Sequence, residues 1–539
     1  MRSFLFAALS VAAGIWAAPA AAGDAPKPKL VVAVSVDQFS ADLFGQYRRH
    51  FTGGLARLAN GVVYSSGYQS HAATETCPGH ATILTGVRPA RSGIIANNWF
   101  DLRAARADKN IYCAEDERVP GTSSEKYEVS TVHLKVPTLG DHMKRADPRS
   151  RVAAVAGKDR TAVMMGGHDV DQRWWWSGSA FTGPGTSPAA ARANHRVAEA
   201  LARAQDPLPL PAPCVARRRA VAIDGGDRQV GAGQFGRAAG NVKVFRASPE
   251  LDQATLDLAS GLRREMRLGE GEASDLLIVG LAATDYVGHT FGNQGSEMCL
   301  HLLALDQALG EFFQELDRTG LDYLVMLTAD HGGQDIPERN REHGITEAAR
   351  VDPSLSFETV GKRLKEKFRL KSSPLHGELA SGDMYVDPTL KPRLRRKVIA
   401  EAVRIYRAHR DVAAVLTADE IAAAPQPVGP PDRWTLMDRA KASFDRERSG
   451  DFLVMLRPRI VAYLDTKNYL ASHGSPWDYD RRVPILFWRK GMAPFDQMLA
   501  VETVDIMPTL AVLLKLPIPP GTIDGRCLDL DEGPESSCR

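Results

Sequence analysis

The chain has 539 residues, of which 44% are hydrophobic and 24% charged, which is enough for one large catalytic domain with insertions or for two domains. A formal net charge of +2 is too small to favour binding to nucleic acid or to a membrane surface. The sequence contains no evident internal repeat or low-complexity tract.

The N-terminus predicts a secretory signal peptide over residues 1–22. Arg2 supplies the positive charge, Phe4 to Trp16 a short apolar stretch, and Ala17 to Ala22 the small residues before a cleavage site. A retained membrane anchor is the alternative, but the apolar stretch is short for a span of about 20 residues. We therefore expect a periplasmic or secreted protein with no transmembrane segment after signal removal.

The first predicted strand, Leu30–Val36, ends at Asp37. An aspartate at a strand end is commonly a turn or cap residue, so Asp37 alone is a weak metal signal. Thr76 lies where a loop enters a helix, and by itself it could be no more than an N-cap. A helix N-terminus nevertheless attracts phosphate oxygens. A hydroxyl bound there to Zn²⁺ would also lose its proton more easily than in water.

Residues 101–270 contain many Pro, Gly and charged residues, and we interpret this stretch as an insertion that covers the edge of a sheet. Within it, Arg151–Ala156 predicts a buried strand, and Lys158 and Arg160 follow that strand directly. These two cations either bind an anion or are solvated charges on a surface turn.

The following part predicts a strand, a helix and a second strand. The strands are Leu276–Leu281 and Tyr323–Thr328. The helix between them has one apolar face, made by Leu302, Leu305, Leu309, Phe312 and Leu316, and Gly320 is its expected C-cap. Short apolar runs of this kind, with Val483–Phe487 as a further one, are typical of strands buried on both faces. We expect an α/β fold with a mostly parallel central sheet and helices on both faces.

Five further candidate metal ligands follow along the chain: Asp285, His289, Asp330, His331 and His473. The last of them comes after a second predicted insertion, residues 348–457. Together with Asp37 they make three Asp and three His, a set of donors that suits two divalent ions, with Zn²⁺ the leading candidate. Sites of open α/β sheets lie at the carboxyl ends of the strands, where the aspartates stand. Two ions about 4 Å apart can clamp the attacking and the leaving oxygen of a phosphoryl transfer.

Six cysteines fit an oxidising compartment, where disulfides persist: Cys77, Cys113, Cys214, Cys299, Cys527 and Cys538. Six cysteines allow fifteen pairings. We predict a Cys527–Cys538 bridge, because it would close a short C-terminal loop, and the other pairings stay open.

The segment from Thr76 to Asn97 resembles the nucleophile segment of the alkaline phosphatase superfamily. The resemblance rests on Gly79-His80, Leu84-Thr85-Gly86, Pro89 and Gly93-Ile94. It is closest to the threonine-nucleophile members, which are the nucleotide pyrophosphatase/phosphodiesterases and the periplasmic bacterial phosphate-irrepressible alkaline phosphatases. Asp505-Ile506-Met507-Pro508-Thr509-Leu510 and Asp524-Gly525 resemble the C-terminal pattern of the superfamily, so the resemblance spans nearly the whole mature chain.

The resemblance implies a single alkaline-phosphatase-like catalytic domain over residues 23–539 that holds two zinc ions. It implies one zinc site made by Asp285, His289 and His473, and another made by Asp37, Asp330 and His331. Thr76 is then the nucleophile and a ligand of the second zinc. The phosphate oxygens are expected to bind Asn97, Lys158, Arg160 and the backbone N–H groups after Thr76.

Lys158 and Arg160 resemble the Lys-x-Arg pair of the monoesterase branch. A phosphate monoester carries one more negative charge than a diester, so additional cations favour the monoester. The sequence therefore predicts a monomeric, zinc-dependent alkaline phosphatase that acts on small phosphate monoesters through a phospho-threonine intermediate. It predicts no binding to nucleic acid.

Four alternatives remain beside this interpretation. A nucleotide pyrophosphatase/phosphodiesterase would use the same metals and nucleophile. A secreted metal- or phosphate-binding protein without turnover and a manganese phosphomutase are less well matched, because the nucleophile is present and is a threonine. A sulfatase of this superfamily needs Cys-x-Pro-x-Arg, whereas Pro78 follows Cys77 directly. His80, one turn after Thr76, is expected to pack against the site rather than to bind metal.

Overall fold

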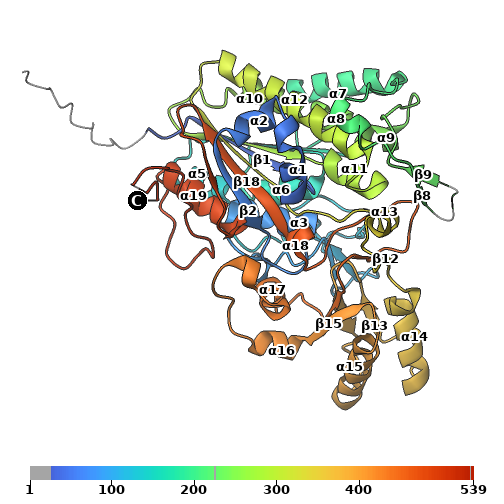
Figure 1. Ribbon diagram of the computed structural model, residues 1–539. Helices are drawn as coiled ribbons and strands as arrows, with labels where there is room; N and C mark the ends of the chain where they lie inside the picture. Colours follow the sequence, from blue (N-terminus) through green and yellow to red (C-terminus); the bar gives the residue numbers. More distant parts are fainter. Residues whose placement is uncertain (1–25, 224–225, 227, 535, 539) are drawn as a thin grey trace, which may run out of the picture.

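The computed structural model describes residues 26–534 and 536–538, except 224, 225 and 227, so the predicted signal peptide lies outside the described residues. A ten-stranded sheet runs through the main body of the molecule (Figure 1). Its centre is a run of adjacent parallel strands, in the order β11 (Tyr323–Thr328), β1 (Leu30–Val36), β10 (Asp275–Leu281), β5 (Val152–Ala156) and β6 (Gln172–Trp176). The predicted α/β fold with a mostly parallel central sheet is confirmed.

The two edges of the sheet are less regular. On one side β18 (Arg482–Arg489) lies antiparallel between β11 and β2 (Val62–Tyr68). The predicted strand Val483–Phe487 is therefore present but runs against its neighbours. Two short strands, β19 (Phe495–Gln497) and β20 (Val501–Glu502), run parallel to β2. At the opposite edge β7 (Phe181–Thr182) pairs antiparallel with β6.

Helices cover both faces of the sheet, and alternate residues of β1 point to the two layers. Val32 and Val34 belong to one hydrophobic core, and Val31 and Ala33 to the other. The first layer is formed by α1 (Ala41–Tyr47), α2 (Gly54–Ala59), α7 (Pro188–Ala202), α10 (Pro249–Met266), α11 (Ala283–Phe291) and α12 (Ser296–Arg318). The second is formed by α3 (Thr76–Thr85), α5 (Leu139–Ala146), α6 (Asp159–Gly166) and α19 (Ile506–Leu513).

Helix α12 is the predicted long helix between the two strands. Its apolar face, from Leu302 to Leu316, is buried in the first core. Thr319 is the C-cap, and Gly320 follows it with φ +71°. Glycine adopts this left-handed conformation without a steric penalty, which explains why the helix ends there.

Residues 348–457 form a lobe beside the main body (Figure 1). Its antiparallel sheet has the order β13 (Leu375–Gly377), β14 (Asp383–Val386), β16 (Phe452–Leu456) and β15 (Val412–Thr417). Two helices, α14 (Phe357–Phe368) and α15 (Pro392–Arg407), pack on it around a separate core. The range 101–270, by contrast, contributes β5, β6, α6 and α10 to the main body as well as surface segments.

The shorter elements connect these units. Those that reappear below are the hairpin of β3 (Asn98–Phe100) and β4 (Asn110–Tyr112), and α9 (Val242–Arg246). The others are α4 (Pro89–Ser92), α8 (Ala212–Val215), β8 (Val221–Ile223), β9 (Arg228–Val230), α13 (Pro337–Glu342), β12 (Ala349–Arg350), α16 (Ala418–Ala423), α17 (Leu436–Ser443), β17 (Ile460–Val461) and α18 (Asp478–Arg481).

Three disulfides join Cys77 to Cys113, Cys214 to Cys299 and Cys527 to Cys538. The predicted C-terminal bridge is confirmed, and the other two link segments far apart in the sequence. Among the described residues, every helix is too short or too polar to span a bilayer.

Candidate metal and phosphate site

Five of the six predicted metal ligands stand at the carboxyl ends of the three central strands. Asp37 follows β1, Asp330 and His331 follow β11, and α11 begins just after β10 with Asp285 and His289 in its first turns. Parallel strands bring their carboxyl ends to one edge, so these segments meet there although they are far apart in the chain. His473 arrives at the same edge in the segment before α18.

The three histidines share one orienting contact. The Nδ1 atoms of His289, His331 and His473 each lie 2.8 Å from a backbone carbonyl oxygen, those of Ala471, Gly332 and Thr74 respectively. A carbonyl can only accept, so each Nδ1 carries the proton. Each Nε2 therefore presents a lone pair, which is the arrangement of metal-binding histidines in proteins.

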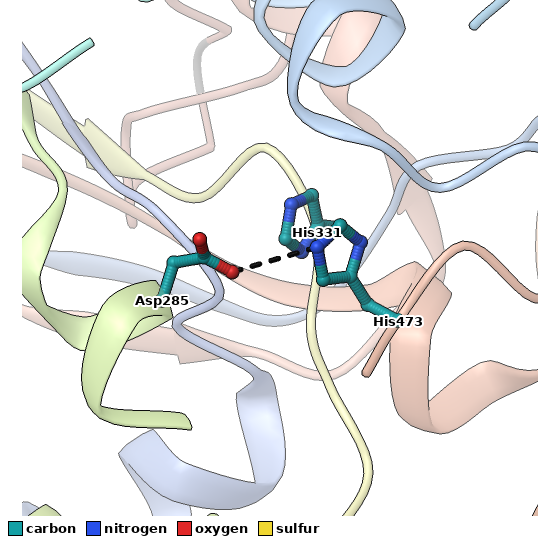
Figure 2. Close-up of side chains that lie close together, drawn as sticks. All are labelled: Asp285, His331 and His473. Atoms are coloured by element: carbon teal, nitrogen blue, oxygen red, sulfur yellow. Dashed lines mark ion pairs between the residues drawn. The ribbon is translucent and has the colours of Figure 1, made fainter. Parts of the chain in front are cut away.

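The Nε2 atoms face carboxylates in two groups. Those of His289 and His473 lie 3.2 Å and 3.4 Å from Oδ1 of Asp285, and Figure 2 shows the second of these contacts. The Nε2 atom of His331 lies 3.4 Å from Oδ1 of Asp37 and 3.3 Å from Oδ2 of Asp330. The structure thus brings together the same two sets of three residues that the sequence predicts.

The two groups are in contact through their imidazoles. The rings of His331 and His473 stack with centroids 3.6 Å apart. Ligand atoms of Asp285, His331 and His473 also lie within 4.8 Å of one another, as do those of Asp37, Asp330 and His331. His331 is therefore within reach of both groups.

The donor atoms fit divalent cations. Within the described part of the chain, Oδ1 of Asp37, Oδ2 of Asp330 and Nε2 of His331 are buried without a hydrogen-bond partner of good geometry. Burial and the neighbouring carboxyl of Asp330 raise the pKa of Asp37 well above its ordinary value, and burial lowers the pKa of His331 to about 3. A bound cation would compensate the buried carboxylates, and a neutral imidazole is the form that binds metal.

Lys158 contacts both groups. Its Nζ lies 2.7 Å from Oδ2 of Asp37 and 2.6 Å from Oδ2 of Asp285, and the side chain is almost fully buried. The sequence predicted that this ammonium would hold phosphate oxygens, whereas here it bridges one carboxylate of each group. Burial opposes its charge, but the two carboxylates outweigh this effect and raise the pKa of Lys158 above its ordinary value.

Thr76 is the first residue of α3, at the same edge of the sheet. Its Oγ1 is buried and has no hydrogen-bond partner among the described residues. The adjacent Cys77 is bonded to Cys113, so it is not the free cysteine that a sulfatase would modify. Nδ1 of His80 lies 2.8 Å from the carbonyl oxygen of Thr76 and 3.2 Å from Oδ2 of Asp330. His80 therefore contacts both the start of α3 and the turn that carries Asp330.

Asn97 lies directly beside the nucleophile segment. Its Oδ1 accepts a hydrogen bond of 2.8 Å from the N–H of Cys77. Pro78 has no N–H, and the N–H of Gly79 bonds to the carbonyl of Glu75. The N–H groups of Cys77 and Gly79 are thus engaged within the protein, and Pro78 has none. Phosphate binding by the backbone after Thr76 stays a prediction.

Arg160 stands in the first turn of α6, two residues after Lys158. Its Nε is buried without a partner among the described residues, and its charge lowers the pKa of the neighbouring Glu75 carboxyl. Burial and Glu378 outweigh that influence and raise the pKa of Glu75 to about 8. The guanidinium therefore acts electrostatically on the residue that precedes Thr76.

Several residues at the site were not singled out from the sequence. Glu75 accepts a 2.7 Å hydrogen bond from the N–H of Asn97. Tyr469 packs edge-on against the ring of His289, and Tyr463 stacks on Tyr469. Lys158 lies 5.1 Å from the ring centroid of Tyr286. Tyr286 follows Asp285 directly, and this position next to a candidate ligand could have marked Tyr286 as a site residue. Tyr463 and Tyr469 lie in an irregular segment with no pattern to mark them.

Comparisons with known proteins identify the family of the chain. The family model described as type I phosphodiesterase / nucleotide pyrophosphatase matches residues 31–476. The chain is 52% identical over 522 residues to the alkaline phosphatase PhoK of Sphingomonas sp, covering 95% of this chain and 93% of that protein. It is 47% identical over 517 residues to the alkaline phosphatase PhoD of Zymomonas mobilis, covering 95% of this chain and 89% of that protein.

A solved structure is also similar over nearly its whole length. The crystal structure of the alkaline phosphatase PafA superposes with a TM-score of 0.81 at 25% identity, covering 94% of this chain and 99% of that one. The curated relative of that name, from Elizabethkingia meningoseptica, is 28% identical to this chain over 538 residues.

Proposed function

This chain belongs to the type I phosphodiesterase / nucleotide pyrophosphatase family of the alkaline phosphatase superfamily and is an alkaline phosphatase, and we propose that it hydrolyses phosphate monoesters with two zinc ions and a phospho-threonine intermediate. The orientation of the three histidines is the observation that supports metal binding. Each imidazole is held through Nδ1 and turns Nε2 toward a carboxylate.

Two sets of side chains would hold the ions: Asp285, His289 and His473 for one, and Asp37, Asp330 and His331 for the other. Aspartate and histidine donors in equal numbers suit Zn²⁺. Bound zinc would supply positive charge that lowers the pKa of coordinated oxygens and offsets the charge of the phosphoryl group.

Thr76 is the proposed nucleophile. The Thr76 hydroxyl gives up its proton as Oγ attacks phosphorus in line, and the bond from phosphorus to the ester oxygen breaks. The ester oxygen takes up a proton from water, so the leaving group departs as an alcohol or phenol. Water then attacks the phosphorus of phospho-Thr76, releasing inorganic phosphate and restoring the hydroxyl. The unpartnered, buried Oγ1 at the start of α3 supports this role.

Asn97 and Arg160 are the proposed ligands of the non-bridging oxygens. The side chain of Asn97 is anchored through Oδ1, which leaves its amide NH₂ to donate. Arg160 presents a fork of N–H groups that matches two phosphate oxygens. Lys158, held between Asp37 and Asp285, would use its third N–H for the phosphate.

Phosphodiester hydrolysis is the second candidate, because the matching family model is named for that activity. The two cations distinguish the candidates, since a monoester gains more from Lys158 and Arg160 than a diester does. The deciding measurement is kcat/KM of the zinc-loaded mature protein on an aryl phosphate and a bis-aryl phosphate with the same leaving group, beside Thr76→Ala. Preference for the monoester, lost in the variant, supports the proposal. Preference for the diester moves the protein to the phosphodiesterases.

We further propose that the protein is exported, cleaved after Ala22 and monomeric. Mass spectrometry of the protein recovered from the periplasm or medium should give a chain beginning at Gly23. Light scattering should give a molar mass close to that of one chain. A retained N-terminus or a dimer mass would contradict these two proposals separately.

A further inference from the structure

The β3–β4 hairpin ties the nucleophile segment to a tyrosine on its second strand. Asn97 precedes β3, Tyr112 ends β4, and the N–H of Cys113 donates a 2.9 Å hydrogen bond to the carbonyl of Asn97. The Cys77–Cys113 disulfide joins the base of the hairpin to α3. The position of Tyr112 is therefore fixed relative to Thr76.

Two tyrosines hold the side chain of Asp159, the first residue of α6. Its Oδ1 accepts a hydrogen bond from the hydroxyl of Tyr112 and its Oδ2 one from the hydroxyl of Tyr127, both of 2.8 Å. Oδ1 also accepts the N–H of Arg160 at 2.8 Å. Both oxygens of this buried carboxylate are thus engaged by neutral donors.

Among the described residues, the guanidinium of Arg160 forms no ion pair with Asp159. Its Nε is buried there without a hydrogen-bond partner. If the Asp159 carboxylate turned toward Arg160, an ion pair between them would compete with a phosphate for the same N–H groups. Here the carboxylate is turned to the tyrosines instead.

We propose that Tyr112 and Tyr127 are positioning residues for phosphate recognition: by donating to both oxygens of Asp159 they keep this carboxylate from pairing with Arg160 and leave the guanidinium for the non-bridging oxygens. The inference rests on the proposed function insofar as Arg160 binds the phosphate.

The test uses inorganic phosphate and a pair of esters. Tyr112→Phe and Tyr127→Phe are each measured for the phosphate dissociation constant by calorimetry, and for kcat/KM on an aryl phosphate and a bis-aryl phosphate. Removing one hydroxyl frees a buried charged group, so we expect phosphate affinity and monoester kcat/KM to fall about tenfold and diester kcat/KM to change less than twofold. Tyr127→Phe with Asp159→Asn should recover most of the loss, because the amide carries no competing charge.

Two backgrounds distinguish positioning from a general structural effect. In Arg160→Ala, the added Tyr112→Phe or Tyr127→Phe should cost nothing more, because the group they act through is gone. Tyr323→Phe is the matched control, since that hydroxyl also donates to a carboxylate, Asp317, at 2.6 Å. It should leave phosphate affinity unchanged.

Three results would overturn the inference. One is an equal loss on both esters, another is an undiminished loss in the Arg160→Ala background, and the third is no recovery with Asp159→Asn. Phosphate affinity is measured without turnover, so it still tests the inference if the wild-type enzyme prefers diesters. A wild-type protein that binds inorganic phosphate but does not hydrolyse the monoester would contradict the proposed function instead. Tyr127 is only half-buried, so its variant keeps the test open if Tyr112→Phe does not fold.

Discussion

Gly79 of α3 packs directly on the backbone of Asp330. A methyl group added to Gly79 would come 2.1 Å from the carbonyl oxygen of Asp330 and 2.9 Å from its Cα. No carbon can approach an oxygen so closely without a bond, so only glycine lets α3 lie against the turn that contains Asp330. A backbone contact thus sets the distance between Thr76 and the candidate ligand group that contains Asp330.

Gly79→Ala should therefore push α3 away from Asp330. Overpacking of this kind costs about 1–3 kcal/mol of stability, and a displaced nucleophile should lower kcat more than tenfold. Gly45→Ala in α1 is the control, because an added methyl there meets nothing within 4 Å. Denaturant unfolding and steady-state kinetics measure the two effects. A Gly79→Ala enzyme with normal kcat would mean that this contact does not position Thr76.

Lys158 and Arg160 should have different effects when removed. Lys158→Ala leaves the carboxylates of Asp37 and Asp285 without their shared counter-ion, and breaking a buried pair costs about 3–5 kcal/mol. We expect a large fall in the melting temperature of chelator-treated Lys158→Ala and a smaller one with zinc. Arg160→Ala should weaken phosphate binding with little change in melting temperature. Identical thermal shifts in the two variants would refute this division.

Together, Lys158→Ala and Arg160→Ala should lower monoesterase activity much more than diesterase activity. The reason is the additional charge of the monoester, which loses two cationic partners. The kcat/KM values for an aryl phosphate and a bis-aryl phosphate provide the comparison. Losses of equal size on both substrates would reduce the two residues to structural cations.

Metal content should follow the two groups of ligands. We expect about two zinc ions per chain in the wild type, fewer in His473→Ala, and unchanged binding in His195→Ala, whose side chain is exposed on α7. A chelator should abolish activity, and zinc should restore it. Elemental analysis after dialysis measures the stoichiometry. Full zinc content in His473→Ala would remove this residue from the ligand set.

Stability should depend on pH through Asp252, which caps the helix that carries Asp285. Its Oδ1 accepts the N–H of Ala283, and burial raises the pKa of this carboxyl from 3.8 to about 7. Between pH 4 and pH 7 the folded protein binds more protons at this group than the unfolded chain does, so the free energy of unfolding falls as the pH rises.

Asp252→Asn removes this titration while keeping an oxygen acceptor for the helix. Relative to the wild type, the variant should gain stability steadily from pH 4 to pH 7 in denaturant unfolding. Parallel stability curves for the two proteins would mean that Asp252 stays ionised throughout that range.

The sequence predicted the central sheet well, because its strands are buried on both faces and leave short, uninterrupted apolar runs. Leu30–Val36 and Tyr323–Thr328 match β1 and β11 to the residue. The same kind of run does not encode direction, and Val483–Phe487 lies in a strand that is antiparallel to its neighbours. The direction of a strand in the sheet depends on its connections to the neighbouring strands, and the residues of one strand do not specify these connections.

For the candidate site, motif spacing selected six candidate ligands that lie together in the structure, but it did not predict every contact. Lys158 was expected on the phosphate, and its bridge between Asp37 and Asp285 depends on side chains more than a hundred residues away. The Cys77–Cys113 bridge could not be chosen among the possible pairings for the same reason. Tyr112 and Tyr127 carry no motif at all, and only the fold brings them to Asp159.

The ligand side chains extend along the chain from Asp37 to His473, and they meet only at the completed edge of the sheet. A polypeptide that is still emerging from the ribosome, or one cut short before the last histidine, holds an incomplete set. The proposed two-metal site can therefore form only after His473 has been added to the chain.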